Sequence, residues 1–276
     1  MVKPATKKEV VTYLVQYHQM SIRQACITSN IARSSYYYEK IVDQEDEVIM
    51  SKLEVLAQNH PTYGFWKMFH RLRNEGNSWN HKKVYRIYKS MNMNLKRKYK
   101  RRLPQRDSIA LEEPSSANQV WSMDFMSDSL QHGRRFRTLN IIDDYNRELC
   151  WLEVAISIDS RAVTKVLDHV IKERGKPETI RVDNGPEFTS YQFMDYCESK
   201  GIEIRYIQPG KPTQNAFIER FNRSYRNEVL NIYRFQKLTE VREISYKWAE
   251  DYNYQRPHES LGNQPPIPFA KQQSNC

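Results

Sequence analysis

Three carboxylates occupy positions where an enzyme could place metal ligands. Asp124 lies inside an apolar, strand-like run, Asp183 ends another such run before an Asn-Gly-Pro turn, and Glu219 follows a Gly-Lys-Pro turn on a helical segment. A charge within an apolar run is costly to bury unless it is paired or bound to metal. In open α/β sheets, sites gather at the carboxyl ends of strands, where Asp183 is expected. The three residues are therefore candidate catalytic ligands for a hard cation such as Mg²⁺.

A sheet with flanking helices is predicted to position these residues after residue 117. Five apolar segments are typical of strands, helical patterns separate the last three of them, and two more helices follow. Consecutive strands and then strand–helix alternation predict an α/β fold with a mixed sheet. The expected strands are 120–126, 135–145, 148–156, 179–183 and 203–208, and the expected helices are 160–174, 190–200, 213–230 and 238–253.

The positive charge of the chain is unevenly distributed. Residues 1–106 contain 21 Lys and Arg against 8 Asp and Glu, whereas residues 107–276 contain 22 against 25, which gives charges of +13 and −3. Such asymmetry indicates that the first part meets a polyanion and that the second is a folded core. A merely solvated basic surface is the alternative interpretation.

The basic first part is predicted to begin with a helix-turn-helix-like segment over residues 1–44. Residues 6–20 suit a helix, Ser21 is a good N-cap for a second helix, and Arg33 opens a third. This is the layout of a helix-turn-helix DNA reader, although short helix pairs are common. Arg33 is therefore a candidate DNA contact.

A second helical DNA-binding unit is predicted over residues 45–95. Its helices are expected at 45–59, 63–75 and 81–92. In the last of them Val84, Ile87 and Met91 recur on one face, as in a helix packed on a core. The basic residues mainly around the rest of this helix are candidate DNA contacts: Lys82, Lys83 and Arg86.

A basic linker is predicted over residues 96–116. Seven of the eleven residues 96–106 are Lys or Arg, and like-charge repulsion with a proline favours an extended chain. Phosphate contact is the favoured role and a solubilising hinge the alternative. The candidate contacts are Lys96, Arg97, Lys98, Lys100, Arg101 and Arg102.

Longer motifs around the acidic residues are more specific. VDNGPEFTS, QPGKPTQNAFIERFNRSYRNEVL and YNYQRPHESLG resemble the OrfB transposases of bacterial insertion sequences in the IS-three family. Asp124, Asp183 and Glu219, with 35 residues between the last two, match the D,D,E signature of retroviral integrases and many transposases. HPTYGFWKMFHRLRNEG resembles the helix-turn-helix that precedes the core in that family. The likeness covers roughly residues 20–270.

The resemblance implies that residues 117–276 form an RNase H-like integrase catalytic core with C-terminal helices. Asp124, Asp183 and Glu219 would hold two Mg²⁺ ions, with Mn²⁺ as a substitute, for two-metal phosphoryl transfer. The expected reactions are DNA strand cleavage at insertion-sequence ends and strand transfer. The expected partners are double-stranded DNA from element ends and target, further copies of this chain, and an upstream OrfA protein or fusion.

Other polar residues near the site are given lesser roles. Asp143 and Asp144 are interpreted as structural residues or as support for the metal ligands. Arg223 and Arg226 share the helix face of Glu219, which favours DNA contact over ordinary intrahelical pairing. Lys211 and Gln214, just before that helix, are secondary DNA-contact candidates. The role of residues 252–258 stays open, and His258 is weighed as a proton shuttle but not favoured.

Three other classes of protein explain less of the sequence. A DNA-binding regulator would leave the three carboxylates without a purpose, and an RNase H-type nuclease would leave the basic helical region unexplained. A retroviral-type integrase would normally bring a zinc-binding His/Cys head, and no such spacing is evident.

The chain is expected to be cytoplasmic and nucleoid-associated in a bacterium. It contains no apolar run of about 18–20 residues, so no membrane span is expected. The start is too polar for a secretory signal. The four cysteines are scattered, which is typical of reduced thiols.

Overall fold

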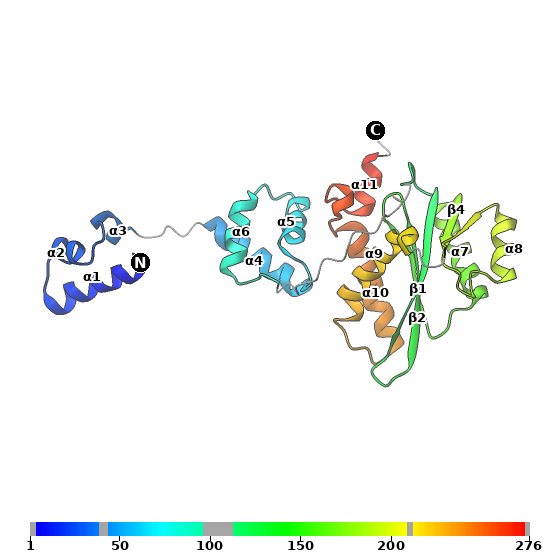
Figure 1. Cartoon of the computed structure of the whole chain (residues 1–276), viewed down its shortest axis with the longest axis horizontal. Helices are drawn as coiled ribbons and strands as arrows, with labels where there is room; N and C mark the ends of the chain where they lie inside the picture. Colours follow the sequence, from blue (N-terminus) through cyan, green and yellow to red (C-terminus); the bar gives the residue numbers. More distant parts are fainter. Residues whose placement is uncertain (1–3, 39–43, 96–112, 209–211, 274–276) are drawn as a thin grey trace. The chain divides into compact units, whose positions relative to one another are not determined.

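The computed structural model describes residues 4–38, 44–95, 113–208 and 212–273. The chain divides into two compact units, residues 1–49 and 50–276 (Figure 1). Among the described residues no helix is both long and apolar enough to cross a membrane.

The first unit contains three short helices. Ser21 caps the second of them: its hydroxyl accepts a hydrogen bond from Gln24 N, and the Gln24 side chain accepts one from Ser21 N. This reciprocal arrangement satisfies two amides that a helix start leaves without partners. A small core of Val11, Ala25 and Cys26 holds the helices together. They are α1 (Pro4–His18), α2 (Ile22–Thr28) and α3 (Arg33–Tyr37).

Three more helices follow, and the boundary between the two units falls within the first of them. Asn80 caps the third, because its side chain accepts a hydrogen bond from Lys82 N. Val84 and Ile87 are buried, as their spacing predicted, whereas Met91 is only half-buried. The helices are α4 (Gln44–Asn59), α5 (Phe65–Asn74) and α6 (His81–Ser90).

A mixed five-stranded sheet forms the centre of the second unit. Its strand order is β3-β2-β1-β4-β5, with β1–β2 and β2–β3 antiparallel and β1–β4 and β4–β5 parallel. This sheet confirms the predicted α/β, RNase H-like class. The strands are β1 (Val120–Ser129), β2 (Arg135–Asp143), β3 (Leu149–Ala155), β4 (Thr179–Val182) and β5 (Glu203–Tyr206).

Helices cover both faces of this sheet (Figure 1). On one face α7 and α8 pack over a core that includes Trp121, Met123 and Ile180. On the other face α9 and α10 pack over a core that includes Met126 and Leu152. The helices are α7 (Ser160–Arg174), α8 (Tyr191–Lys200), α9 (Ala216–Tyr225) and α10 (Leu238–Tyr254), followed by α11 (Pro266–Gln273), which the sequence did not lead us to expect.

The predicted helix at 213–230 is in fact three consecutive pieces. A 3₁₀ turn over Pro212–Asn215 precedes α9, and a π-helical turn over Arg226–Leu230 follows it. Such π turns are frequent at functional sites and change the direction of the side chains that follow.

The edge strand β3 is bound to α10 through a side chain. Leu149 N donates a hydrogen bond to Asn253 Oδ1 at 2.9 Å, and Asn253 Nδ2 donates to Leu149 O at 2.9 Å. The hydroxyl of Tyr252 donates to Arg147 O at 3.2 Å. Two residues of α10 therefore satisfy backbone groups at the start of this strand.

Candidate active site

The alternation of side chains along β1 and β4 places Asp124 and Asp183 on the same face of the sheet. Trp121, Met123 and Ile180 point into the core beneath α7 and α8. Because side chains alternate along a strand, Asp124 and Asp183 point to the opposite face, which α9 covers. The parallel pairing of β1 with β4 runs from Val120–Thr179 to Ser122–Arg181, so Asp124 and Asp183 each follow the last paired residue by two positions. Neighbouring strands lie about 4.8 Å apart.

Helix α9 brings Glu219 to the same place. The helix packs on the sheet through Ile218, Phe221 and Tyr225, which are buried. Asn222 Nδ2 donates a hydrogen bond to Asp124 Oδ2 at 2.6 Å. Glu219 precedes Asn222 by three residues, so the two side chains are neighbours on the helix surface. Glu219 therefore borders Asp124.

The electrostatics of Asp124 agree with this arrangement. Burial raises the pKa of its carboxyl to about 6, and the charges of Asp183 and Glu219 raise it too, against hydrogen bonds from Phe125 N and Asn222. Asp124 and Asp183 are half-buried, whereas Glu219 is exposed. The charges of Asp183 and Glu219 therefore both act on Asp124, on a surface that is partly open to solvent.

The loop after β4 orients Asp183. Gly185 N donates to Asp183 Oδ1 at 3.0 Å. A Cβ added to Gly185 would lie 3.0 Å from the same oxygen, so a side chain here would force the Asp183 carboxylate to shift by a few tenths of an ångström. Asn184 Nδ2 donates to Ile207 O at 3.0 Å and ties the loop to the end of β5. The Asp-Asn-Gly sequence therefore holds the Asp183 carboxylate in place as well as turning the chain.

The donor chemistry of the site fits a hard divalent cation. Carboxylate oxygens are the ligands that Mg²⁺ takes while it retains waters. Asp124 is half-buried with one backbone donor and one amide donor, which leaves lone pairs on both oxygens. In the described part of the chain no group of three or more His, Cys, Asp or Glu side chains is placed so that it could hold a metal ion. The three carboxylates would therefore have to move closer together to share a cation.

Comparisons with known proteins agree with this geometry. Two integrase core domain models match residues 114–212 and 200–266, and an HTH-like domain model matches residues 43–101. An insertion element IS476 protein of Xanthomonas euvesicatoria is 36% identical over 97% of this chain and 77% of its own length. An insertion element IS407 protein of Burkholderia multivorans is 37% identical over 91% of each chain. A putative transposase for insertion sequence IS150 of Escherichia coli is 23% identical over 88% of this chain and 91% of its own length.

The chain belongs to the insertion-element transposases. It is an enzyme of the integrase-core type, and its core acts in DNA cleavage and integration.

Two acidic residues of the transposase outside the three-carboxylate site have structural partners. Asp144 pairs with Arg181 at 2.7 Å and accepts a hydrogen bond from Ser122 Oγ at 2.9 Å. Asp143 accepts hydrogen bonds from the backbone of Asn118 and Tyr145. These contacts favour the structural interpretation of both residues.

The arginines that share the Glu219 face of the transposase differ in their contacts. Arg223 is exposed and has no ion-pair partner among the described residues. Arg226 binds Asp128 at 3.2 Å and donates to Ser127 O at 3.0 Å, so its guanidinium is already engaged with β1. Of the two, Arg223 is the freer to meet a phosphate.

The remaining predicted DNA contacts of the transposase lie on separate segments of the chain. Arg33 is exposed at the start of α3 in the first unit. On α6, Lys82 and Arg86 are exposed and Lys83 is half-buried. Gln214 Oε1 accepts a hydrogen bond from Gln208 N at 2.8 Å, which supports the chain before α9. The other candidates lie outside the described residues: Lys96, Arg97, Lys98, Lys100, Arg101, Arg102 and Lys211.

Asn222 is the residue that sequence reasoning missed at the site. Besides its bond to Asp124, its Oδ1 accepts a hydrogen bond from Asn140 Nδ2 at 2.7 Å. A polar residue three positions after Glu219, on the face that packs against the sheet, was the available signal. Its side chain thus connects α9 to Asp124 of β1 and to Asn140 of β2.

A buried ion-pair network explains part of the segment whose role the sequence left open. Arg256 binds Glu228 at 2.8 Å, and both side chains are less than a tenth exposed. Lys67 of α5 also binds Glu228, at 3.1 Å, and Trp248 Nε1 donates to it at 3.0 Å. The second and third sequence motifs of the transposase thus meet at this carboxylate.

His258 is not suited to the proton shuttle weighed for it. Its side chain is buried against Tyr252, with ring centroids 4.7 Å apart. Burial, and then the charges of Arg256 and Lys67, hold the pKa of His258 well below its usual value. The imidazole is therefore neutral and enclosed.

Proposed function

We propose that Asp124, Asp183 and Glu219 are the catalytic residues and hold two Mg²⁺ ions, with Mn²⁺ as a substitute, for cleavage at insertion-sequence ends and strand transfer. The observation that supports this proposal is the shared face: Asp124 and Asp183 each follow the last β1–β4 pair by two residues, and Asn222 of α9 donates a hydrogen bond to Asp124. Bound in a pair, such ions activate an attacking oxygen and stabilise a leaving one.

The residues of the chain supply orientation for this chemistry. Asp124 is fixed by Phe125 N and Asn222, and Asp183 is fixed by Gly185 N. Glu219 is exposed at the start of α9, which leaves the site open to a polymer substrate. A strand end with a 3′-hydroxyl meets the same groups as water does, so one site serves both cleavage and joining.

Double-stranded DNA is the proposed substrate at both the element ends and the target. Arg223 is an exposed arginine on the helix that carries Glu219, and the basic residues of 96–102 add sequence-independent phosphate contacts. Because two element ends must be handled together, we propose that copies of the chain assemble on DNA. An upstream OrfA protein or fusion is a further proposed partner.

Single alanine variants of the three carboxylates test the proposal. Labelled element-end DNA is incubated with the full chain and Mg²⁺, Ca²⁺ or no metal. We expect Asp124→Ala, Asp183→Ala and Glu219→Ala to abolish cleavage while DNA binding stays near normal. Asp195→Ala, an exposed aspartate on α8, is the matched control and keeps full activity. Near-normal cleavage by all three variants in Mg²⁺ would remove the site from consideration.

A further inference from the structure

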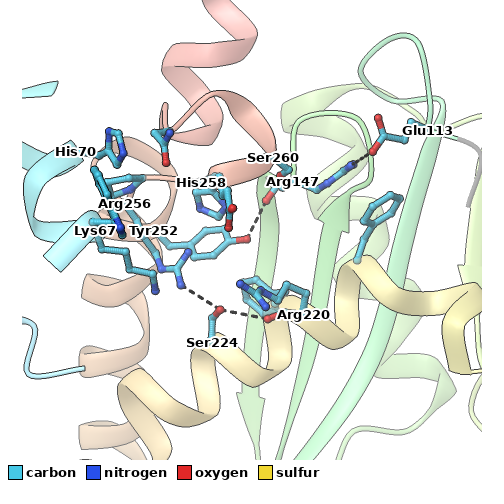
Figure 2. A pocket seen from close by; sticks show the side chains of 16 residues that line it. Lys67, His70, Glu113, Arg147, Arg220, Ser224, Tyr252, Arg256, His258 and Ser260 are labelled. Atoms are coloured by element: carbon cyan, nitrogen blue, oxygen red, sulfur yellow. Dashed lines mark hydrogen bonds and ion pairs between the residues drawn. The ribbon is translucent and has the colours of Figure 1, made fainter. Parts of the chain in front are cut away.

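A hollow in the second unit has none of the three carboxylates among its lining residues. A cavity of about 800 Å³ opens between α5, α9 and the chain that follows α10 (Figure 2). Its volume lies within the range of small-ligand sites, about 300–1,000 Å³. The residues that matter for its chemistry are Trp66, Arg147, Phe217, Arg220, Tyr252 and His258.

Helix α9 separates the cavity from the proposed catalytic site. Phe217, Arg220 and Ser224 line the cavity and recur at i, i+3 and i+7, so they form one face of the helix. Glu219 and Asn222 lie on the side toward the sheet carboxylates. The exposed surface of α9 between these faces carries Arg223. A DNA strand that crosses this surface would pass from the carboxylates to the cavity. The two sites are separated by about one helix diameter, or about 10–12 Å.

The walls of the cavity include aromatic side chains. Trp66 is 57% exposed although it is a large apolar residue. Phe217 is half-buried, and the Arg147 guanidinium lies 3.5 Å from its ring centroid. Tyr252 also lines the cavity, with 3% of its surface exposed. Nucleobases stack on such aromatic and guanidinium planes whatever their sequence.

One of the four cationic side chains of the cavity is free of ion pairs. Lys67 and Arg256 are bound to Glu228, and Arg147 is bound to Glu113 at 2.9 Å. Arg220 is exposed and has no ion-pair partner among the described residues. It sits at the α9 wall of the cavity in Figure 2. Arg220 is therefore the group available to a phosphate that enters with a base.

A polar atom beside the cavity also lacks a partner. The Nε2 atom of His258 is buried and has no hydrogen bond with the described residues. Leaving such a group unpaired costs about 1–3 kcal/mol. A neutral imidazole either donates or accepts, which suits the mixed edge of a base better than a bare phosphate.

We propose that this cavity takes one unpaired nucleotide of the DNA strand, with its base among Trp66, Phe217 and Tyr252 and its phosphate on Arg220. The proposal rests on the proposed function, because it is the DNA held at the carboxylates that crosses α9. Taking a base out of a duplex costs stacking and pairing, so DNA that already carries unpaired nucleotides is bound more tightly.

The test compares duplexes that differ only in unpaired nucleotides. The full chain is titrated, without divalent metal, with a blunt duplex and with the same duplex carrying a few unpaired nucleotides at its 3′ or its 5′ end. We expect at least one overhang to bind about fivefold tighter or more, which is the lower range for one stacked base. Trp66→Ala and Arg220→Gln should each remove this preference and leave blunt-end binding within about twofold.

Matched variants outside the cavity control for folding and charge. Tyr191→Ala removes an aromatic side chain that is 89% exposed, and Arg161→Gln removes an exposed arginine on α7. Both should retain the preference. Equal binding of blunt and overhang duplexes by the unaltered chain, or a preference that survives in both cavity variants, would overturn the proposal. Because no metal is present, this result is independent of Mg²⁺-dependent cleavage, whose failure would instead count against the carboxylate site.

Discussion

Replacement of Glu228 by Gln should destabilise the second unit by about 3 kcal/mol. This carboxylate is buried and binds Arg256, Lys67 and the indole nitrogen of Trp248. Glutamine keeps the size of the side chain but removes its charge. The arginine and the lysine then lack the anion that compensates their burial.

Two independent arguments give this loss of about 3 kcal/mol in the free energy of unfolding. Burial alone would raise the pKa of Glu228, but hydrogen bonds and charges from Arg256 and Lys67 outweigh it and lower the pKa to about 2, from an ordinary 4.5. A difference of roughly 2.5 pH units corresponds to about 3 kcal/mol at about 1.4 kcal/mol per unit. Removing one partner of a buried ion pair generally costs about 3–5 kcal/mol.

The sign of the pH dependence follows from the lowered pKa. A carboxylate whose pKa is lower in the folded state stabilises that state fully above its unfolded pKa, here 4.5. The contribution declines as the pH falls from there toward about 2. The difference in unfolding free energy between the native chain and Glu228→Gln should therefore be full at neutral pH and shrink in acid.

Urea unfolding followed by tryptophan fluorescence measures this effect. All five tryptophans lie after residue 50, so the signal reports the second unit. Glu250→Gln, an exposed glutamate on α10, is the matched control and should change the free energy by less than about 0.5 kcal/mol. Arg256→Met added to Glu228→Gln should cost clearly less than the two single changes summed. A cost below about 1 kcal/mol at neutral pH, or a difference that stays constant down to acid pH, would refute the reasoning.

Three further changes probe the site and the DNA contacts. Gly185→Ala should lower cleavage at least tenfold with DNA binding retained, because the new methyl group displaces Asp183. Unchanged cleavage rates would contradict the tight contact described for this glycine. Asn222→Ala should lower cleavage about tenfold, since a hydrogen bond to a carboxylate contributes about 1.5–3 kcal/mol. Asn227→Ala, which changes an exposed asparagine, serves as its control. Equal cleavage rates for the two variants would argue against a positioning role for Asn222. Replacing the basic residues of 96–102 with Gln should weaken binding to all DNA and flatten its salt dependence in filter-binding titrations, and an unaltered slope would exclude phosphate contact.

The sheet could be predicted from sequence, and the candidate site residues could be chosen from it, because both depend on local patterns. Alternating apolar runs located all five strands, and their order with the helices indicated a mixed sheet. The Ser21 cap followed from a short-range rule about helix starts. Asp124 was recognisable because a charged side chain inside an apolar strand is costly to bury unless it is paired or bound to metal.

The supporting contacts were not accessible because each joins residues far apart in the chain. Asn222 contacts Asp124 across 98 positions, and Asp144 finds Arg181 across 37. Arg256 and Glu228 are 28 positions apart on either side of α10. No local pattern specifies such pairings. The π-helical turn after α9 was also missed, because its sequence continues the helical pattern of α9.

The two hydrogen bonds between Asn253 and Leu149 have a consequence for self-association. β3 ends the sheet, and an outer strand with open amides and carbonyls invites pairing with another polypeptide. The carboxamide of Asn253 occupies one donor and one acceptor there, much as an additional strand would. A chain that lost α10 would bare this backbone together with the apolar face beneath it. Premature termination before residue 238 should therefore yield aggregates rather than a smaller, well-behaved protein.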